Sequence, residues 1–291
     1  MNKSKLTAIC HKISKEKGLP FNSVMTYYFL ENILEKLATS NYSKNFVFKG
    51  GFLLSNVVGI DYRSTVDIDF LLKARKFSRE NIYKIIKESL ETGNSDIPDN
   101  NIIYKVQTME RIKEEDKYGG FRCKILCVLE NIKQIVPLDI ATGDIITPFP
   151  LDYEYLPIFK DKKIPIKAYP LETMLAEKIQ TVYSRGLLNS RSKDYYDIYI
   201  IYKMKNKEIN SEFLKEACVK TFEYRNTEFS TEKIINLLEK LKLNDMFLQR
   251  WESYSAKNFH AKEIKFEEVI NNCIKIIELI NNNSFDKNTG D

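Results

Sequence analysis

Residues 66–72 read VDIDFLL, and this stretch decides how the rest of the sequence is interpreted. Polar and apolar residues alternate at its start, a pattern that predicts a β-strand. Side chains two residues apart point to the same face of a strand, so Asp67 and Asp69 share one face, and Ile68 and Phe70 share the other. Two carboxylates whose Cα atoms are about 7 Å apart can lean together and share a hard cation. Mg²⁺ suits such oxygen ligands, with Mn²⁺ as a substitute; the ordinary alternative is a solvated strand face.

A glycine pair precedes this strand. The run Phe46-Val47-Phe48 predicts a short strand that ends at Lys49-Gly50-Gly51, and residues 52–58 predict a short helix. Glycines let the backbone come close to phosphate oxygens, and a helix N-terminus offers free N–H groups. The pair therefore predicts a phosphate-binding turn, although an ordinary tight turn explains it equally well.

A third acid, Asp139, lies near the end of the strand predicted over 134–141. Three carboxylates around one or two metal ions suit in-line attack of a hydroxyl on an α-phosphate, and the third acid can help to deprotonate that hydroxyl. Asp144 is a weaker candidate, and its position favours a cap on the turn at Gly143.

Arg63, Ser64 and Thr65 stand directly before the acidic pair. They bring one cation and two hydroxyls within reach of bound phosphates, and Thr65 shares the face of Asp67 because it is two residues away. The alternative is that Ser64 and Thr65 only begin the strand.

The order of predicted elements indicates an α+β protein with two domains. Residues 1–165 form a domain with a mixed β-sheet flanked by helices, and residues 166–291 form a helical domain. In the first domain the patterns predict helices over 23–39 and 78–92 and strands over 102–110, 120–129 and 134–141. In the second they predict helices over 171–184, 193–204, 211–223, 231–250 and 262–281.

Composition limits the possible chemistry. The chain has 2 His and 5 Cys without a CxxC pair, so a histidine base, a zinc knuckle or a disulfide framework is not expected. The net charge of +5 is weak support for a nucleic-acid partner. No apolar run reaches the roughly 20 residues that span a bilayer, and the N-terminus lacks the apolar core of a signal peptide, which predicts a cytoplasmic protein without membrane contact.

Together these motifs resemble the nucleotidyltransferases of the polymerase-beta superfamily. The 15 residues between the glycine pair and Asp67 (52–66) are similar to the spacing in the AbiEii toxin family of abortive-infection toxin–antitoxin systems. A second set is similar to the EK…R…KDxxD signature of that family: Glu177-Lys178-Ile179, Arg185, and the run from Lys193 to Asp197. Phe52 stands where many relatives have Thr.

The resemblance implies a toxin that moves an NMP from an NTP to an RNA 3′-hydroxyl, with tRNA as the expected acceptor, and that a cognate antitoxin neutralises. Relatives add pyrimidine nucleotides to the 3′ end of tRNA, and AbiEii itself is associated with GTP. The resemblance favours Lys178 on the triphosphate with Asp194 orienting it, whereas the residues alone favour a structural ion-pair network of Lys178, Asp194 and Asp197. The predicted catalytic residues are Asp67, Asp69, Asp139, Lys178 and Asp194, the predicted metal ligands are the first three, and the predicted nucleotide-binding residues are Lys49, Gly50, Gly51, Arg63, Ser64, Thr65 and Lys178.

Three other functions remain open at this point. The nucleotide could be transferred to a small molecule, which would need an acidic pocket for a cationic acceptor, or to a protein side chain. The chain could also be a binding module without catalytic activity. Basic and tyrosine residues alternate over 183–205, a pattern that suits RNA but that core packing also explains.

Overall fold

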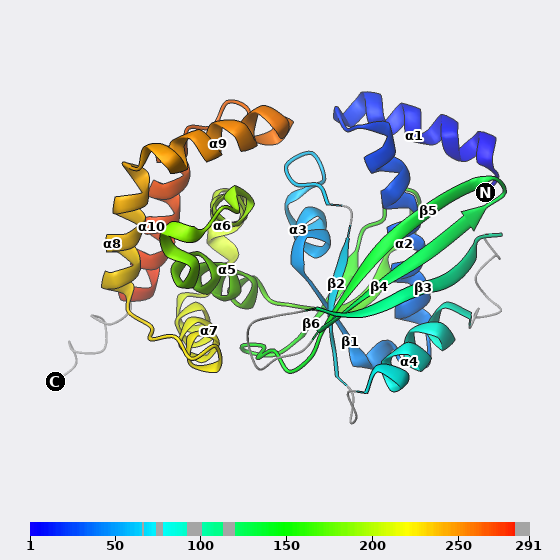
Figure 1. Ribbon diagram of the computed structural model, residues 1–291, viewed down its shortest axis with the longest axis horizontal. Helices are drawn as coiled ribbons and strands as arrows, with labels where there is room; N and C mark the ends of the chain where they lie inside the picture. Colours follow the sequence, from blue (N-terminus) through cyan, green and yellow to red (C-terminus); the bar gives the residue numbers. More distant parts are fainter. Residues whose placement is uncertain (66, 74–77, 92–100, 113–119, 283–291) are drawn as a thin grey trace. The chain divides into compact units, whose positions relative to one another are not determined.

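A computed structural model of the 291-residue chain describes residues 1–65, 67–73, 78–91, 101–112 and 120–282. The chain divides into two compact units (Figure 1). Unit 1 contains residues 1–144 and 150–168, and unit 2 contains residues 145–149 and 169–291. None of the helices in the described part of the chain is both long and apolar enough to cross a membrane.

Unit 1 is built on a mixed sheet of seven strands in the order β3-β4-β5-β2-β1-β7-β6. The strands β3, β4 and β5 form an antiparallel meander, β5 then pairs with β2 in parallel, and β1 pairs antiparallel with β2 and parallel with β7. The parallel pairings bring chain segments that are distant in sequence to the centre of the sheet. The strands are β1 (Phe46–Lys49), β2 (Ile68–Leu72), β3 (Ile103–Ile112), β4 (Gly120–Leu129), β5 (Ile132–Ala141), β6 (Leu151–Tyr155) and β7 (Ile164–Ala168).

The sheet buries one face of its meander. In β4, Cys123, Ile125 and Cys127 are fully buried, whereas Arg122 and Lys124, which alternate with them, are exposed. This alternation follows from the two-residue period of a strand and is typical of an antiparallel sheet covered on one side. Helices cover the buried side, because α2 contacts β5 and β7 and α4 contacts β3.

The helices of unit 1 differ in how much they bury. In α2, twelve of 19 residues are buried, Glu31 and Asn32 among them, so this helix is enclosed on most sides. α3 begins directly after β1 and contacts both β1 and β2, which places its N-terminus beside the acidic strand. The helices are α1 (Lys3–Lys17), α2 (Phe21–Thr39), α3 (Gly50–Val58) and α4 (Arg79–Glu91).

Unit 2 is helical. Thr147, in the segment 145–149, exchanges two hydrogen bonds with Thr173 of α5: its N–H donates to Oγ1 at 2.9 Å, and its carbonyl accepts from Oγ1 at 2.8 Å. These bonds fix the short segment to unit 2. The helices are α5 (Leu171–Arg185), α6 (Ser192–Lys205), α7 (Ser211–Tyr224), α8 (Thr231–Lys242), α9 (Asp245–Lys257) and α10 (Phe266–Asn282).

The predicted fold class, an α+β protein with a mixed sheet and a helical second part, is confirmed. The single helix predicted over 231–250 is wrong: the structure has α8 and α9, because the Asn244 side chain caps a new helix by accepting from the Met246 N–H at 3.1 Å. The strands β6 and β7 were not predicted. Val66 and Thr92, assigned above to a strand and a helix, lie outside the described residues.

Candidate active site

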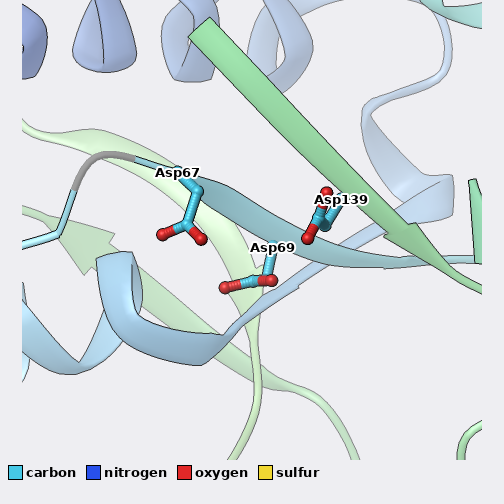
Figure 2. A group of neighbouring side chains, drawn as sticks. All are labelled: Asp67, Asp69 and Asp139. Atoms are coloured by element: carbon cyan, nitrogen blue, oxygen red, sulfur yellow. The ribbon is translucent and has the colours of Figure 1, made fainter. Parts of the chain in front are cut away.

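The three acids of the predicted site come together on one face of the sheet. Asp69 lies in β2 and pairs with Asp139 of β5 in the parallel register, while Asp67 directly precedes β2. One carboxylate oxygen from each residue lies within 4.8 Å of those from the other two, and Figure 2 shows the three groups facing a common space. Parallel pairing of two strands is therefore what joins residues 70 positions apart.

The glycine pair lies against these acids. Gly50 has a φ of +71°, and a Cβ at this position would lie 2.0 Å from Oδ2 of Asp69. A Cβ on Gly51 would lie 3.1 Å from Nη2 of Arg63 and 3.2 Å from Oγ1 of Thr65. Only glycine allows the α3 N-terminus to approach the carboxylate this closely, so free N–H groups and the acids share one location.

Hydrogen bonds hold the segment 63–65, which precedes the acids. The Thr65 N–H donates to the Tyr27 hydroxyl at 3.1 Å, and that hydroxyl donates to Ser55 at 2.9 Å. Burial raises the pKa of Tyr27, which keeps its proton on the hydroxyl as a donor. The Thr65 hydroxyl in turn donates to Oδ1 of Asp67, and Arg63 is buried beside Gly51. A chain of hydrogen bonds through Thr65 thus fixes the side chain of Asp67.

Lys49 ends β1, directly opposite Asp69 in the antiparallel register. Its ammonium group forms an ion pair with Asp144, and both side chains are largely buried. The structure thus pairs the weaker acid candidate with the predicted phosphate-binding lysine.

Arg122 of β4 is a member of the site that the sequence analysis missed. It pairs with Asp139 across the strands, and its Nε donates to Oδ1 at 2.7 Å while its Nη2 donates to Oδ2. The pKa of Arg122 is raised, first by these hydrogen bonds and then by the charge of Asp139, with contributions from Asp67 and Asp69. The guanidinium therefore interacts electrostatically with all three carboxylates.

The donor set fits a hard divalent cation. Three carboxylates offer oxygen ligands within 4.8 Å of one another, the chemistry that Mg²⁺ and Mn²⁺ prefer. The side chain of Asp139 is 16% exposed, so ligand oxygens remain accessible from solvent. Because Gly50 has no side chain, the Asp69 carboxylate can occupy its position in the cluster.

The second predicted set lies in unit 2. Lys178 of α5 forms ion pairs with Asp194 at 2.7 Å and Asp197 at 2.8 Å, both in α6 and both buried. Burial alone would lower the pKa of Lys178, but the two carboxylates more than offset this effect, and the pKa is raised. Arg191 lies 3.4 Å from the other oxygen of Asp194. The ion-pair network expected from the residues alone is present, and a phosphate-binding role for Lys178 stays a prediction.

Comparison with known proteins now identifies the family. The family described as nucleotidyl transferase AbiEii toxin, type IV toxin–antitoxin system, matches residues 32–272. The chain belongs to this family. It is therefore a nucleotidyltransferase toxin, and its family implies a nucleotide substrate and a cognate antitoxin. No curated protein sequence matches the chain.

Two solved structures share the fold of this AbiEii family member. One is a crystal structure of a candidate nucleotidyltransferase from H. pylori, with a TM-score of 0.56, 14% identity, and coverage of 94% of this chain and 100% of that one. The other is JHP933 from Helicobacter pylori, with a TM-score of 0.55, 14% identity, and coverage of 92% and 97%. The similarity covers nearly the whole chain, so it extends to both units.

The predicted residues of the AbiEii member fall into two groups. Unit 1 brings together the three acids, the glycine pair and the segment 63–65, and unit 2 brings together Lys178 and Asp194. The sequence signal for Arg122 was the alternation in β4, which places it on the exposed face. The register of β4 against β5, which the sequence does not state, sets it opposite Asp139.

Proposed function

We propose that this toxin transfers an NMP from an NTP to the 3′-hydroxyl of an RNA, with tRNA as the acceptor, and so blocks translation. The observation that carries the proposal is the three-carboxylate cluster beside the glycine-opened N-terminus of α3. Acids for a cation and free N–H groups for phosphate oxygens are the two elements that phosphoryl transfer needs. Transfer to tRNA would place its action in the cytoplasm.

The acidic cluster, the start of α3 and the pair in unit 2 have different roles in the proposed reaction. Asp67, Asp69 and Asp139 would hold Mg²⁺ or Mn²⁺, which supplies charge stabilisation at the α-phosphate when it is bound. The N–H groups that open α3 bind phosphate oxygens, and Thr65 orients Asp67. The family resemblance alone supports Lys178 as a phosphate ligand and Asp194 as the residue that orients it.

The bond changes balance as follows. The 3′-oxygen of the acceptor forms a bond to the α-phosphorus, the bond between that phosphorus and the bridging oxygen breaks, and pyrophosphate leaves. Asp139 accepts the hydroxyl proton and passes it to solvent. Arg122 holds the Asp139 carboxylate through both oxygens, so it orients this base.

The test is incubation of the purified protein with total tRNA, Mg²⁺ and each α-labelled NTP in turn. We expect label in tRNA, and Asp67→Ala or Asp69→Ala should lower turnover by at least ~10²-fold, because charge stabilisation by a metal contributes several kcal/mol. Label only in a small molecule or in a protein would assign a different acceptor. Toxicity that persists in Asp67→Ala, with no transfer by the wild type, would indicate a binding module.

A further inference from the structure

The meander β3-β4-β5 has an open face that continues the acidic site. Asp69, Asp139 and Arg122 form one row across three adjacent strands, on the face opposite the buried Cys123. The exposed side chains of the meander lie on this same side of the sheet because the strand period is two. The site therefore lies at the edge of a larger exposed surface.

Three lysines occupy this open face. Lys124 is two residues from Arg122 in β4, Lys105 of β3 pairs with Leu126, and Lys133 of β5 pairs with Val128. All three are exposed. At about 3.4 Å per residue, they lie about 7, 14 and 20 Å along the strands from the row that contains Asp139. They form a series that leads away from the acids, and we name these three residues the lysine track.

In the part of the chain that the structure describes, the lysine track has no acidic partner. Within the described strands of the meander, Glu110 is the one acid on the open face besides Asp139. None of the three lysines forms a salt bridge with a described residue. The hairpin β6–β7 in the same unit differs, because Lys163 pairs with Glu154 at 2.8 Å and Lys167 with Asp152 at 2.6 Å. A series of exposed lysines without an acidic partner among the described residues suits a ligand with evenly spaced negative charge.

We propose that the lysine track binds the phosphates of the acceptor RNA strand and leads its 3′ end to Asp139. This inference rests on the proposed function, since it assigns the surface that the acceptor occupies. The distance of about 20 Å from the acids to Lys133 is long enough for several consecutive nucleotides of one strand. Exposed apolar side chains lie between the lysines, Ile135 among them, and can contact the sugars. Seen from the acids, the three lysines lie beyond Arg122. They attract the phosphates of the RNA strand, and the end of that strand then lies beside the acids.

The experiment compares two triple variants with the same charge change. The track variant is K105Q/K124Q/K133Q. The control is K12Q/K84Q/K87Q, which removes three exposed lysines from α1 and α4. Each of them pairs with a glutamate four residues along its helix at 3.8 Å, a weak surface contact. Binding of a 5′-labelled tRNA is followed by fluorescence anisotropy over about 50–300 mM KCl, and the KM for NTP is measured in the transfer reaction.

Each lysine–phosphate contact adds about 0.7–0.9 to the slope of log Kd against log salt. The track variant should therefore lose about 2–3 from this slope and bind tRNA about 10–100-fold more weakly at about 100 mM salt. The control should stay close to the wild type, and the KM for NTP should be unchanged in both variants.

The outcomes separate this inference from the proposed function. If the wild type labels tRNA but the track variant binds it like the wild type, or no more weakly than the control, the track is refuted and the function stands. If the wild type neither binds nor labels tRNA, the proposed function fails and the track fails with it.

Discussion

The substitution Gly50→Ala tests the closest contact in the site. The added Cβ would lie 2.0 Å from Oδ2, 2.6 Å from Cγ and 2.7 Å from Cβ of Asp69. Ordinary contacts begin at about 3.4 Å, so the carboxylate has to move by more than about 1 Å. Gly50 also has a φ of +71°, which is strained for any residue with a side chain.

Two costs follow from this geometry. The positive φ lowers the free energy of unfolding by about 1–3 kcal/mol. Displacement of a metal ligand by about 1 Å lowers turnover by about 10²-fold, because the reacting groups lose their alignment. We also expect Mn²⁺ binding, measured by electron paramagnetic resonance, to weaken by at least about tenfold, since Asp69 is one of only three carboxylates in the cluster.

Gly186→Ala is the matched control. Gly186 has a φ of +47°, but a Cβ there meets no atom within 4 Å. This variant therefore has the backbone strain without a steric clash. It should lower the free energy of unfolding by a similar amount, while turnover and Mn²⁺ affinity stay within about twofold of the wild type. The reasoning is refuted if Gly50→Ala and Gly186→Ala show the same Mn²⁺ affinity and the same turnover.

Three further substitutions test other parts of the molecule. Arg122→Gln should tighten Mn²⁺ binding severalfold by removing a competing cation from Asp139, and it should lower turnover. Arg122→Lys keeps the charge and should bind Mn²⁺ like the wild type. An unchanged Mn²⁺ affinity in Arg122→Gln would contradict this role. Lys178→Met leaves two buried carboxylates without their lysine partner and should lower the free energy of unfolding in urea by about 3–5 kcal/mol; a loss below about 1 kcal/mol would argue against the network. Burial raises the pKa of Glu31 from 4.5 to about 7, so the folded state binds this proton more tightly than the unfolded state does. The free energy of unfolding therefore falls as the pH rises from about 4.5 through 7, by up to about 3 kcal/mol. Glu31→Gln should flatten that part of the curve of unfolding free energy against pH, and an unchanged curve would exclude Glu31 as its source.

The acidic cluster was largely predictable because it depends on local rules. The two-residue period of a strand places Asp67 and Asp69 on one side, and the glycine pair marks the start of a helix at the end of a strand. Asp139 needed one further assumption, that its strand is the neighbour of the first. The parallel pairing of β2 with β5 fulfils it, but nothing local in the sequence specifies that pairing.

The missed features depend on register and on weak local signals. Arg122 belongs to the site only because β4 pairs with β5 in a register that sets it opposite Asp139, and a shift by one residue would turn it to the buried face. The strands β6 and β7 are only five residues each, and Pro165 in β7 obscures the pattern. The break between α8 and α9 falls in a continuous helical pattern, where the cap by Asn244 outweighs the periodicity.

Arg122 also explains how the cluster tolerates its own charge. Three carboxylates within 4.8 Å repel one another, and this repulsion is unfavourable unless a cation is near. One guanidinium bound to Asp139 leaves the four groups with a formal charge of −2, which a single divalent cation neutralises. Since the Arg122 side chain is 50% exposed, solvent weakens its hold on the carboxylate, and it can yield one oxygen to a metal while keeping the other. The same residue therefore stabilises the fold of the acidic edge and leaves it open to a cation, which an arginine buried at this position would not allow.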